Sequence, residues 1–338
     1  MGSIAQTTDE SDQELPRVLL PAFGEPIPAS SLRASVTQAI TAWLLRTPSL
    51  ATRANYRCDL HQFLQFSGID PARPEQLLSI RPEQVAAWRE QLQQANRANS
   101  TVARKLTVLR SLFSYLQVYG YSGANPAHSK FVVAPAVPRD GKTVGLSPKD
   151  CRRLLEAPEA TTPLGLRDRA IFCVLAFSAC RVGELVRLKV EDFRTNGEHR
   201  VLTLMGKGGK ERTVPIHLEA VEQLTEWLKI AAIHEDRSGP LFRPCQSARG
   251  DGHDGFARRF LTVRAIEYLV TRYAQQIGLD RSVTVHSFRV TALTTARERG
   301  ADIADLQDFA GHADPRTTLT YIRTRDRLSR SPAYVLNY

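Results

Sequence analysis

Residues 306–321 read LQDFAGHADPRTTLTY, and this stretch places Tyr321 nine residues after the Gly-His pair that ends at His312. A phenol has an unperturbed pKa of about 10, so it is a poor nucleophile near neutral pH. A tyrosine that acts as a nucleophile needs neighbours that take its proton and stabilise its anion. His312 and the basic residues upstream could do both, whereas Tyr321 alone would be interpreted as a packing residue.

The composition is typical of a globular protein with a polyanionic partner. The chain has 338 residues, 42% of them hydrophobic, which is enough for two domains with a core each. Its formal net charge of +10 indicates nucleic acid most simply, because Lys and Arg that neutralise phosphates release counterions. The longest apolar run, 170–180, is too short to span a bilayer and is predicted to be a buried helix.

The cysteines and the N-terminal residues predict a cytoplasmic protein without a metal. The five cysteines are scattered, odd in number and contain no CxxC pair, which favours reduced thiols and argues against a zinc site. Residues 1–17 are polar and acidic and lack the apolar segment of a signal peptide. We therefore expect a cytoplasmic location, no membrane contact and no cofactor.

The first part of the chain is predicted to be a bundle of about four helices. Residues 1–30 are polar and proline-rich, so we expect a flexible N-terminal tail. Apolar residues then recur at helical spacing over 31–125, and Ser100 is placed to cap the fourth helix. The proline-punctuated residues 126–145 are predicted to be a linker.

The second region, residues 146–338, is predicted to be mostly helical with a small antiparallel sheet and a C-terminal tail. Ser147 can cap a helix that has Pro148 at its first position. Further helices are expected over 167–188, 218–230, 262–277 and 287–299. Two short strands, 201–205 and 212–216, are expected to form a hairpin through the turn Gly-Lys-Gly-Gly-Lys. The chain is therefore predicted to be mainly α, with two domains.

Two motifs in this region could bind phosphate. In CRVGEL (180–185), Arg181 follows an apolar helix, and its planar guanidinium suits two phosphate oxygens. The alternative is a surface ion pair between Arg181 and Glu184. Lys207 and Lys210 lie in the glycine-rich turn, which lacks the spacing of a P-loop. That turn is either solvated or delivers a mobile lysine to a phosphate or leaving group.

A third motif, HSFR, places His286 and Arg289 one helical turn apart, so both should face the same way. The fourth is the Gly-His pair with Tyr321. Isolated histidines are more often core or surface residues than catalytic ones. The order Arg, Lys, His-x-x-Arg, Gly-His and Tyr within a basic chain favours one shared site.

These motifs resemble the tyrosine recombinase (phage integrase) family, especially its Xer-type and integron or transposon integrase branches. The resemblance covers residues from about 32 to 325 and includes GKGGKERTVPI (206–216), HSFR (286–289) and GHADPRTTLTY (311–321). The first domain resembles the family's SAM-like core-binding domain through SLATRANYRCDLHQFLQF (49–66) and STVARKLTVLRSLFSYLQVYG (100–120). The departures Gly183, Val290, Ala310 and Arg323 lie outside the core catalytic positions.

The resemblance implies a helical core-binding domain and an α+β catalytic domain that cut and rejoin DNA. Tyr321 would attack a phosphodiester to give a 3′-phosphotyrosyl link, and strand exchange would pass through a Holliday junction. Arg181 and Arg289 would hold the non-bridging oxygens, and Lys207 would protonate the leaving 5′ oxygen. His286 and His312 would assist proton transfer and phosphate binding, while Glu184 would orient Arg181.

The implied partners are double-stranded DNA with inverted repeats and three further copies of the chain on two DNA sites. An accessory DNA-binding or recombinase partner is left open. The role would be integration, transposition or resolution of DNA elements at the bacterial nucleoid. The residues predicted to contact DNA are Arg53, Arg57, Arg104, Arg110 and Lys210.

Three alternatives stay open at this point. A basic DNA-binding protein with a decayed site is disfavoured by the intact residue set. A type IB topoisomerase or a telomere resolvase would share the covalent tyrosine chemistry. Asp302, Asp305 and Asp308 are spaced three apart and could hold magnesium, but a solvated helix face is sufficient to explain them and is the preferred interpretation.

Overall fold

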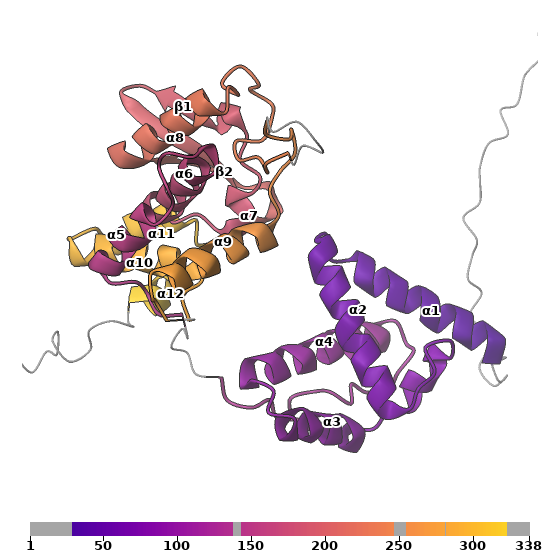
Figure 1. Cartoon of the computed structure of the whole chain (residues 1–338). Helices are drawn as coiled ribbons and strands as arrows, with labels where there is room; N and C mark the ends of the chain where they lie inside the picture. The colour runs from indigo at the N-terminus through magenta and orange to yellow at the C-terminus, as the bar shows by residue number, and fades with distance from the viewer. Residues whose placement is uncertain (1–28, 138–142, 247–254, 281, 323–338) are drawn as a thin grey trace, which may run out of the picture. The chain divides into compact units, whose positions relative to one another are not determined.

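The structure is a computed structural model that describes residues 29–137, 143–246, 255–280 and 282–322 (Figure 1). The side chains of residues 29, 30, 207, 321 and 322 are outside this description. The chain divides into two compact units at the bond between Val137 and Pro138. Among the described residues, no helix is long and apolar enough to cross a membrane.

The first unit is a small helical bundle around an aromatic core. Phe63 lies against Trp88 with ring centroids 5.1 Å apart, and Trp43 donates from its indole nitrogen to Ser111 Oγ at 3.0 Å. Leu106, Leu109 and the other apolar residues of the last helix fill the centre. The elements are α1 (Ala29–Leu45), α2 (Leu50–Ser67), η1 (Pro74–Ser79), α3 (Pro82–Gln94) and α4 (Asn99–Val118).

Tertiary contacts move one predicted helix start. The prediction that Ser100 caps the fourth helix is wrong, because α4 begins at Asn99 with Ala98 before it and has no side-chain cap. The Asn99 amide instead donates to the carbonyl of Ala136 at 2.9 Å. In contrast, Ser49 caps α2 by accepting from the Thr52 backbone nitrogen at 3.3 Å.

The core of the first unit extends into the segment predicted to be a linker. Ala127 and Val132 are buried in it. Arg110 donates to the carbonyl oxygens of both residues, at 2.9 Å and 2.6 Å. Asn125 adds a hydrogen bond to Ser114 Oγ at 2.8 Å. These contacts make residues up to about 132 part of the first unit's packing.

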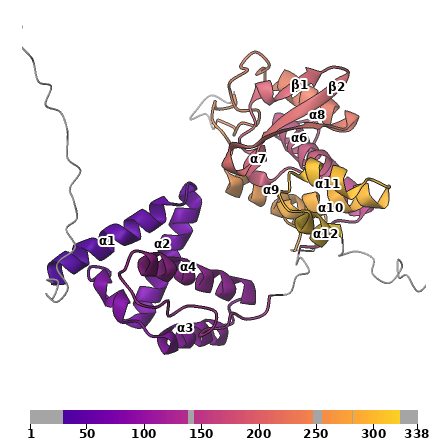
Figure 2. The ribbon, with the colours of Figure 1, turned by 180° about the vertical axis from the view of Figure 1, so that it is seen from behind.

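The second unit combines eight described helices with a three-stranded antiparallel sheet of order β1-β2-β3. Strands β1 and β2 lie with α8 at one end of the unit, and α10 and α12 lie at the other (Figure 2). The predicted strand pair is present, and Phe193–Asn196 adds a strand that the sequence did not predict. The strands are β1 (Phe193–Asn196), β2 (His199–Met205) and β3 (Glu211–Pro215). The helices are α5 (Pro148–Glu156), α6 (Pro163–Ser178), α7 (Val182–Leu185), α8 (Leu218–Ile230), α9 (Val263–Gln276), α10 (Val285–Glu298), α11 (Ile303–Ala310) and α12 (Pro315–Ile322).

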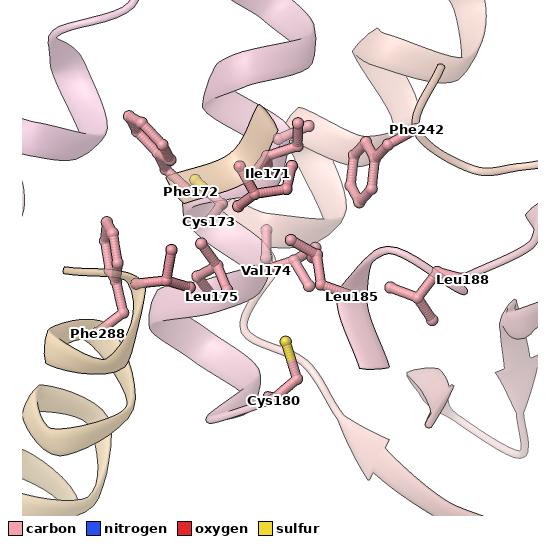
Figure 3. Packing of buried hydrophobic residues seen from close by; sticks show 14 of the residues in the cluster. Ile171, Phe172, Cys173, Val174, Leu175, Cys180, Leu185, Leu188, Phe242 and Phe288 are labelled. Atoms are coloured by element: carbon pink, nitrogen blue, oxygen red, sulfur yellow. The ribbon is translucent and has the colours of Figure 1, made fainter. Parts of the chain in front are cut away.

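Helix α6 is the centre of the second core. Its residues Ile171, Phe172, Val174 and Leu175 are fully buried, as the long apolar run predicts. Figure 3 shows these side chains among residues from α10, from α7 and from the segment around Phe242. A helix segment that is apolar on all sides has to be enclosed by other elements. Here α7 and α10, where two of the predicted motifs lie, pack against it.

The prediction of one helix over 167–188 is wrong. Helix α6 ends at Ser178, and Ala179 adopts a left-handed conformation with φ 49° and ψ 25°. A new helix, α7, begins after Arg181. One tertiary and one local contact hold the break: the Ala179 carbonyl accepts a hydrogen bond from Arg289 of α10, and the Ser178 hydroxyl accepts one from the Cys180 nitrogen. This break sets the position of Arg181.

Candidate active site

Arg181 lies at the N-terminus of α7, beside the carboxylate of Glu184. Its Nη1 donates to Glu184 Oε1 at 3.0 Å, and its backbone nitrogen donates to Oε2 at 2.9 Å. The Arg181 side chain keeps 44% of its surface exposed, while Glu184 keeps 4%. The ion pair that was the alternative interpretation is therefore present, and it leaves the arginine accessible to a ligand.

Burial alone would raise the pKa of Glu184. The hydrogen bonds and positive charges of Arg212 and Arg181 outweigh this effect and hold the pKa of the carboxyl below its usual range. Arg212, on β3, donates to both carboxylate oxygens at 3.0 Å and 2.9 Å. Glu184 is thus an ionised, buried anion shared by two arginines.

Arg289 lies on α10 and is 1% exposed. Its guanidinium donates to the carbonyl of Ala179 and to the carbonyl of Ala310, the latter at 2.6 Å. Nη2 of Arg289 also lies 2.7 Å from Nε2 of His312. The break after α6 and the end of α11 therefore fix this cation before any ligand arrives.

His312 is 6% exposed, and burial together with the charges of Arg289 and Arg181 lowers its pKa to about 4. The ring is therefore neutral near neutral pH. Because a guanidinium can only donate, Nε2 accepts from Arg289 and Nδ1 carries the proton. Nδ1 then donates to Thr318 Oγ1 at 2.9 Å, which connects the site to α12.

His286 precedes Arg289 by one turn of α10, and its ring is exposed. Loss of water on the covered side of the ring lowers its pKa, and the charges of Arg289 and Arg181 lower it further. His286, Arg289 and Arg181 line one cavity of about 430 Å³, whose other wall includes Glu267 and Thr271 of α9. The predicted phosphate ligands from two separate motifs thus meet around one opening.

Three arginines converge on consecutive carbonyls at the C-terminal end of α11. Arg212 Nε donates to Phe309 O at 3.3 Å, and Arg181 Nη2 donates to Gly311 O at 3.3 Å. Arg289 Nη2 donates to the carbonyl of the intervening residue, Ala310. The C-terminus of a helix carries partial negative charge, so it attracts these cations. The end of α11 gathers residues from α7, β3 and α10 into one cluster.

Two predicted catalytic residues can be placed only by their backbone. Lys207 begins the short turn η3 (Lys207–Gly209) between β2 and β3, and Tyr321 lies in α12. Their side chains lie outside the described part of the structure. Lys210, in the same turn as Lys207, is exposed and lines a larger cavity of about 1100 Å³ with Arg181, Arg212 and His312.

The arginines predicted to bind DNA in the first unit differ in their surroundings. Arg104 donates to both carboxylate oxygens of the buried Asp59, and Arg110 donates to the carbonyls named above. Arg53 donates to the carbonyls of Thr47 and Leu45. Arg57 is exposed. Three of the four guanidiniums therefore make contacts within the unit, although Arg104 keeps 49% of its side-chain surface exposed.

The acidic residues considered for magnesium have local explanations. Asp302 caps α11 by accepting from the Ala304 nitrogen at 2.7 Å. Asp305 and Asp308 lie on the same helix and line the larger cavity. Within the residues that the structure describes, no group of three or more His, Cys, Asp or Glu side chains could hold a metal ion.

Sequence reasoning missed Arg212 as a residue of the site. It stands in GKGGKERTVPI, two residues after Lys210, and a strand position gave no reason to single it out. The available signal was the alternation of the strand: Arg212 and Val214 lie on one face of β3. A charged residue on the face that points to the core needs an anion, and Glu184 supplies it.

The chain belongs to the phage integrase family. Residues 145–327 match the model of the phage integrase family, and residues 41–118 match that of its N-terminal SAM-like domain. Among characterised relatives, tyrosine recombinase XerD of Ralstonia nicotianae is 32% identical over 307 residues, which cover 90% of this chain and 94% of that protein. Tyrosine recombinase XerC of Thermodesulfovibrio yellowstonii is 30% identical over 288 residues, covering 82% and 87% of the two chains.

Solved structures confirm the predicted fold class. A XerH site-specific recombinase bound to palindromic difH substrate aligns with a TM-score of 0.65 at 20% identity, covering 91% of this chain and 84% of that one. A lambda integrase dimer bound to a COC′ core site aligns with a TM-score of 0.65 at 17% identity, covering 88% and 78%. The family predicted from the motifs is confirmed, and the chain is a tyrosine recombinase.

Proposed function

We propose that the chain is a site-specific recombinase that cuts and rejoins double-stranded DNA through a 3′-phosphotyrosyl link at Tyr321. The observation that carries the proposal is the convergence of Arg181, His286 and Arg289 on one cavity of about 430 Å³. A phosphodiester is the ligand that two guanidiniums and an imidazole suit best. Their separation in the sequence makes a chance arrangement a poor explanation.

The two arginines have different parts in this proposal. Arg289 is buried and fixed by two carbonyls, so its charge needs no reorganisation when the phosphate becomes pentacoordinate. Arg181 is partly exposed and can turn a guanidinium edge to a non-bridging oxygen. Glu184 orients Arg181. Electrostatic stabilisation of the transition state is the main contribution of both arginines.

The remaining residues would move protons and place the nucleophile. Lys207 would protonate the leaving 5′ oxygen, and His286 would donate to a phosphate oxygen. Neutral His312 holds Nη2 of Arg289 and, through Thr318, the helix that carries Tyr321. Tyr321 follows Thr318 by three residues in α12, so one helical turn separates the nucleophile from the anchor.

The proposed partner is double-stranded DNA with inverted repeats, on which four copies of the chain assemble over two sites. A net charge of +10 suits this partner, and the XerH and lambda integrase structures named above contain DNA. Arg57, Arg104 and Lys210 are the exposed members of the predicted contact set, and Arg104 among them is also paired with Asp59. In this proposal residues 31–125 form the core-binding domain, 146–338 the catalytic domain, and the protein acts in the cytoplasm at the nucleoid.

The test is a suicide-substrate assay with nicked DNA from the protein's own locus, without metal or ATP. We expect a protein–DNA adduct that survives denaturant and that Tyr321→Phe abolishes. Tyr119→Phe, at an exposed tyrosine of the first unit, is the matched control and should leave the adduct unchanged.

Other outcomes would assign a different function. Tight binding without an adduct would favour a DNA-binding protein with an inactive site. Relaxation of plasmids that lack the native site would favour a type IB topoisomerase. DNA products with closed hairpin ends would favour a telomere resolvase. Recombination between two native sites is the result that supports integration, transposition or resolution.

A further inference from the structure

Arg212 connects three parts of the active site. From β3 it donates to both oxygens of Glu184, at 3.0 Å and 2.9 Å, and to the carbonyl of Phe309 at 3.3 Å. Its side chain is 15% exposed, so little of it is available for a ligand. A guanidinium with these contacts is committed to the protein rather than to DNA.

The carboxylate of Glu184 is fixed by hydrogen bonds on both sides. Arg212 supplies two of them, and Arg181 supplies two more through Nη1 and the backbone nitrogen. Because Arg212 occupies one side in a two-point contact, the carboxylate cannot rotate, and it presents a fixed edge to Arg181. The orientation of the exposed Arg181 side chain thus depends on a residue that does not line the smaller cavity of about 430 Å³.

Gly311 shows that the site is shaped around Arg212. A Cβ added to Gly311 would lie 2.9 Å from Arg212 Nη1 and 3.1 Å from its Cζ. Gly311 also has a φ of 60°, which disfavours other residues. The glycine of the Gly-His pair therefore leaves room for the guanidinium, which then reaches Phe309 O.

We propose that Arg212 is a positioning residue that orients Arg181 toward the scissile phosphate through the carboxylate of Glu184. This inference rests on the proposed function, in which Arg181 holds a non-bridging oxygen. Arg212 makes no contact with the substrate. Its loss leaves DNA binding in place but moves Arg181 out of line with the phosphate.

The kinetic test compares full-length Arg212→Gln with the full-length wild type in single-turnover cleavage of the suicide substrate. At saturating DNA we expect the rate to fall by roughly 100-fold, the loss that small misplacements of catalytic groups produce. The dissociation constant for DNA should change less than about 3-fold, because only the contact of Arg181 with one phosphate is disturbed and that contact is a small part of the binding energy. Arg212→Lys keeps the charge but lacks the planar fork that donates from two nitrogens in parallel, so its rate should lie between those of the wild type and Arg212→Gln.

Arg200→Gln is the matched control. Arg200 lies on β2 of the same sheet, is half-buried, donates to Thr195 Oγ1 at 2.9 Å and stacks over Phe193 at 4.0 Å. Within the described part of the structure, this hydrogen bond and this ring contact both go to residues of β1. We expect wild-type cleavage from this variant. An equal loss in both variants would mean that Arg212 merely supports the sheet and would overturn the proposal.

A double-mutant cycle tests the route through Glu184. If Arg212 acts on Arg181 only by fixing Glu184, the double variant Arg212→Gln/Glu184→Gln should cut no more slowly than the slower single variant. Multiplicative losses would show independent action and would overturn the proposal. So would a wild-type rate for Arg212→Gln at saturating DNA.

A measurement on the protein without DNA separates this inference from the proposed function. The ¹⁵Nε resonance of Arg181, assigned by its loss in Arg181→Lys, should shift and broaden in Arg212→Gln but not in Arg200→Gln. If the wild type forms no adduct, the proposed function fails, and this spectrum still decides whether Arg212 orients Arg181. An unchanged resonance would overturn the inference; where Arg212→Gln does not fold, Arg212→Lys takes its place.

Discussion

His312 couples the charge of the site to stability. Its burial, reinforced by Arg289 and Arg181, lowers the pKa to about 4, against about 6.5 for an unfolded histidine. Between these values the unfolded chain binds a proton that the folded site refuses. The contribution of neutral His312 to the free energy of unfolding is therefore complete above about pH 6.5, and it is lost as the pH falls toward 4.

We predict that His312→Asn makes the free energy of unfolding less sensitive to acid. The wild type should lose about 2 kcal/mol from this residue between about pH 7 and pH 4.5, and the variant should lack that share. Urea unfolding at the two pH values measures the free energy of unfolding of each protein. The loss between the two pH values is then compared between the wild type and His312→Asn. Parallel pH profiles for the two proteins would show that the buried ring does not titrate below its usual range.

Single residues also show where pattern reasoning stops. Arg104 and Arg110 look like phosphate ligands in the sequence, because basic residues on a predicted DNA-binding bundle invite that interpretation. The structure pairs Arg104 with Asp59 and Arg110 with two backbone carbonyls. A sequence records that an arginine is present, but its partner comes from residues 15 or more positions away.

At the scale of elements, the break between α6 and α7 decides the site. The run from Ala170 to Cys180 contains neither glycine nor proline, so its pattern predicts an uninterrupted helix. Ala179 nevertheless adopts a left-handed conformation, in which its carbonyl meets Arg289. A strained non-glycine residue persists when surrounding contacts over-determine it, and here those contacts come from α10.

We predict that α6 tolerates no side chain at Gly165. A Cβ there would lie 1.8 Å from the carbonyl oxygen of Glu159, a backbone atom that cannot swing away. Gly165→Ala should lower the free energy of unfolding by about 3 kcal/mol, as strong overpacking does. Chemical denaturation followed by circular dichroism measures the change.

Gly183→Ala is the control for this prediction. Gly183 lies in α7, and a Cβ at that position meets no atom within 4 Å. Alanine should be neutral there or stabilise by up to about 1 kcal/mol, because glycine loses more backbone entropy in a helix. Equal stabilities of the Gly165→Ala and Gly183→Ala proteins would contradict the packing at the start of α6.

At the scale of the whole molecule, two units with separate cores share one basic chain. Most contacts of such a protein with duplex DNA go to phosphates, which position the protein without specifying sequence. Each neutralised phosphate releases counterions, so affinity should depend steeply on salt.

We predict that affinity for the native site falls on the order of 1,000-fold or more between about 50 mM and about 200 mM salt. Fluorescence anisotropy with a labelled duplex measures it. Arg57→Ala should make the slope of the logarithm of the binding constant against the logarithm of the salt concentration shallower, by about the amount expected for one phosphate contact. A loss of less than about tenfold over this range would mean that binding does not depend mainly on phosphates.

The sequence by itself determined the family, the mainly helical class, the strand pair β2–β3 and the residues of the four motifs. Helical and alternating periodicity record which face is buried, and the motif residues are local enough to be seen along the chain. The start of α4, the strand β1, the break at Ala179 and the contacts of Arg212 became visible only in the tertiary structure. The break at Ala179 and the contacts of Arg212 depend on polar groups whose partners lie far away in sequence, Arg289 for Ala179 and Glu184 for Arg212, and burial makes those pairings obligatory.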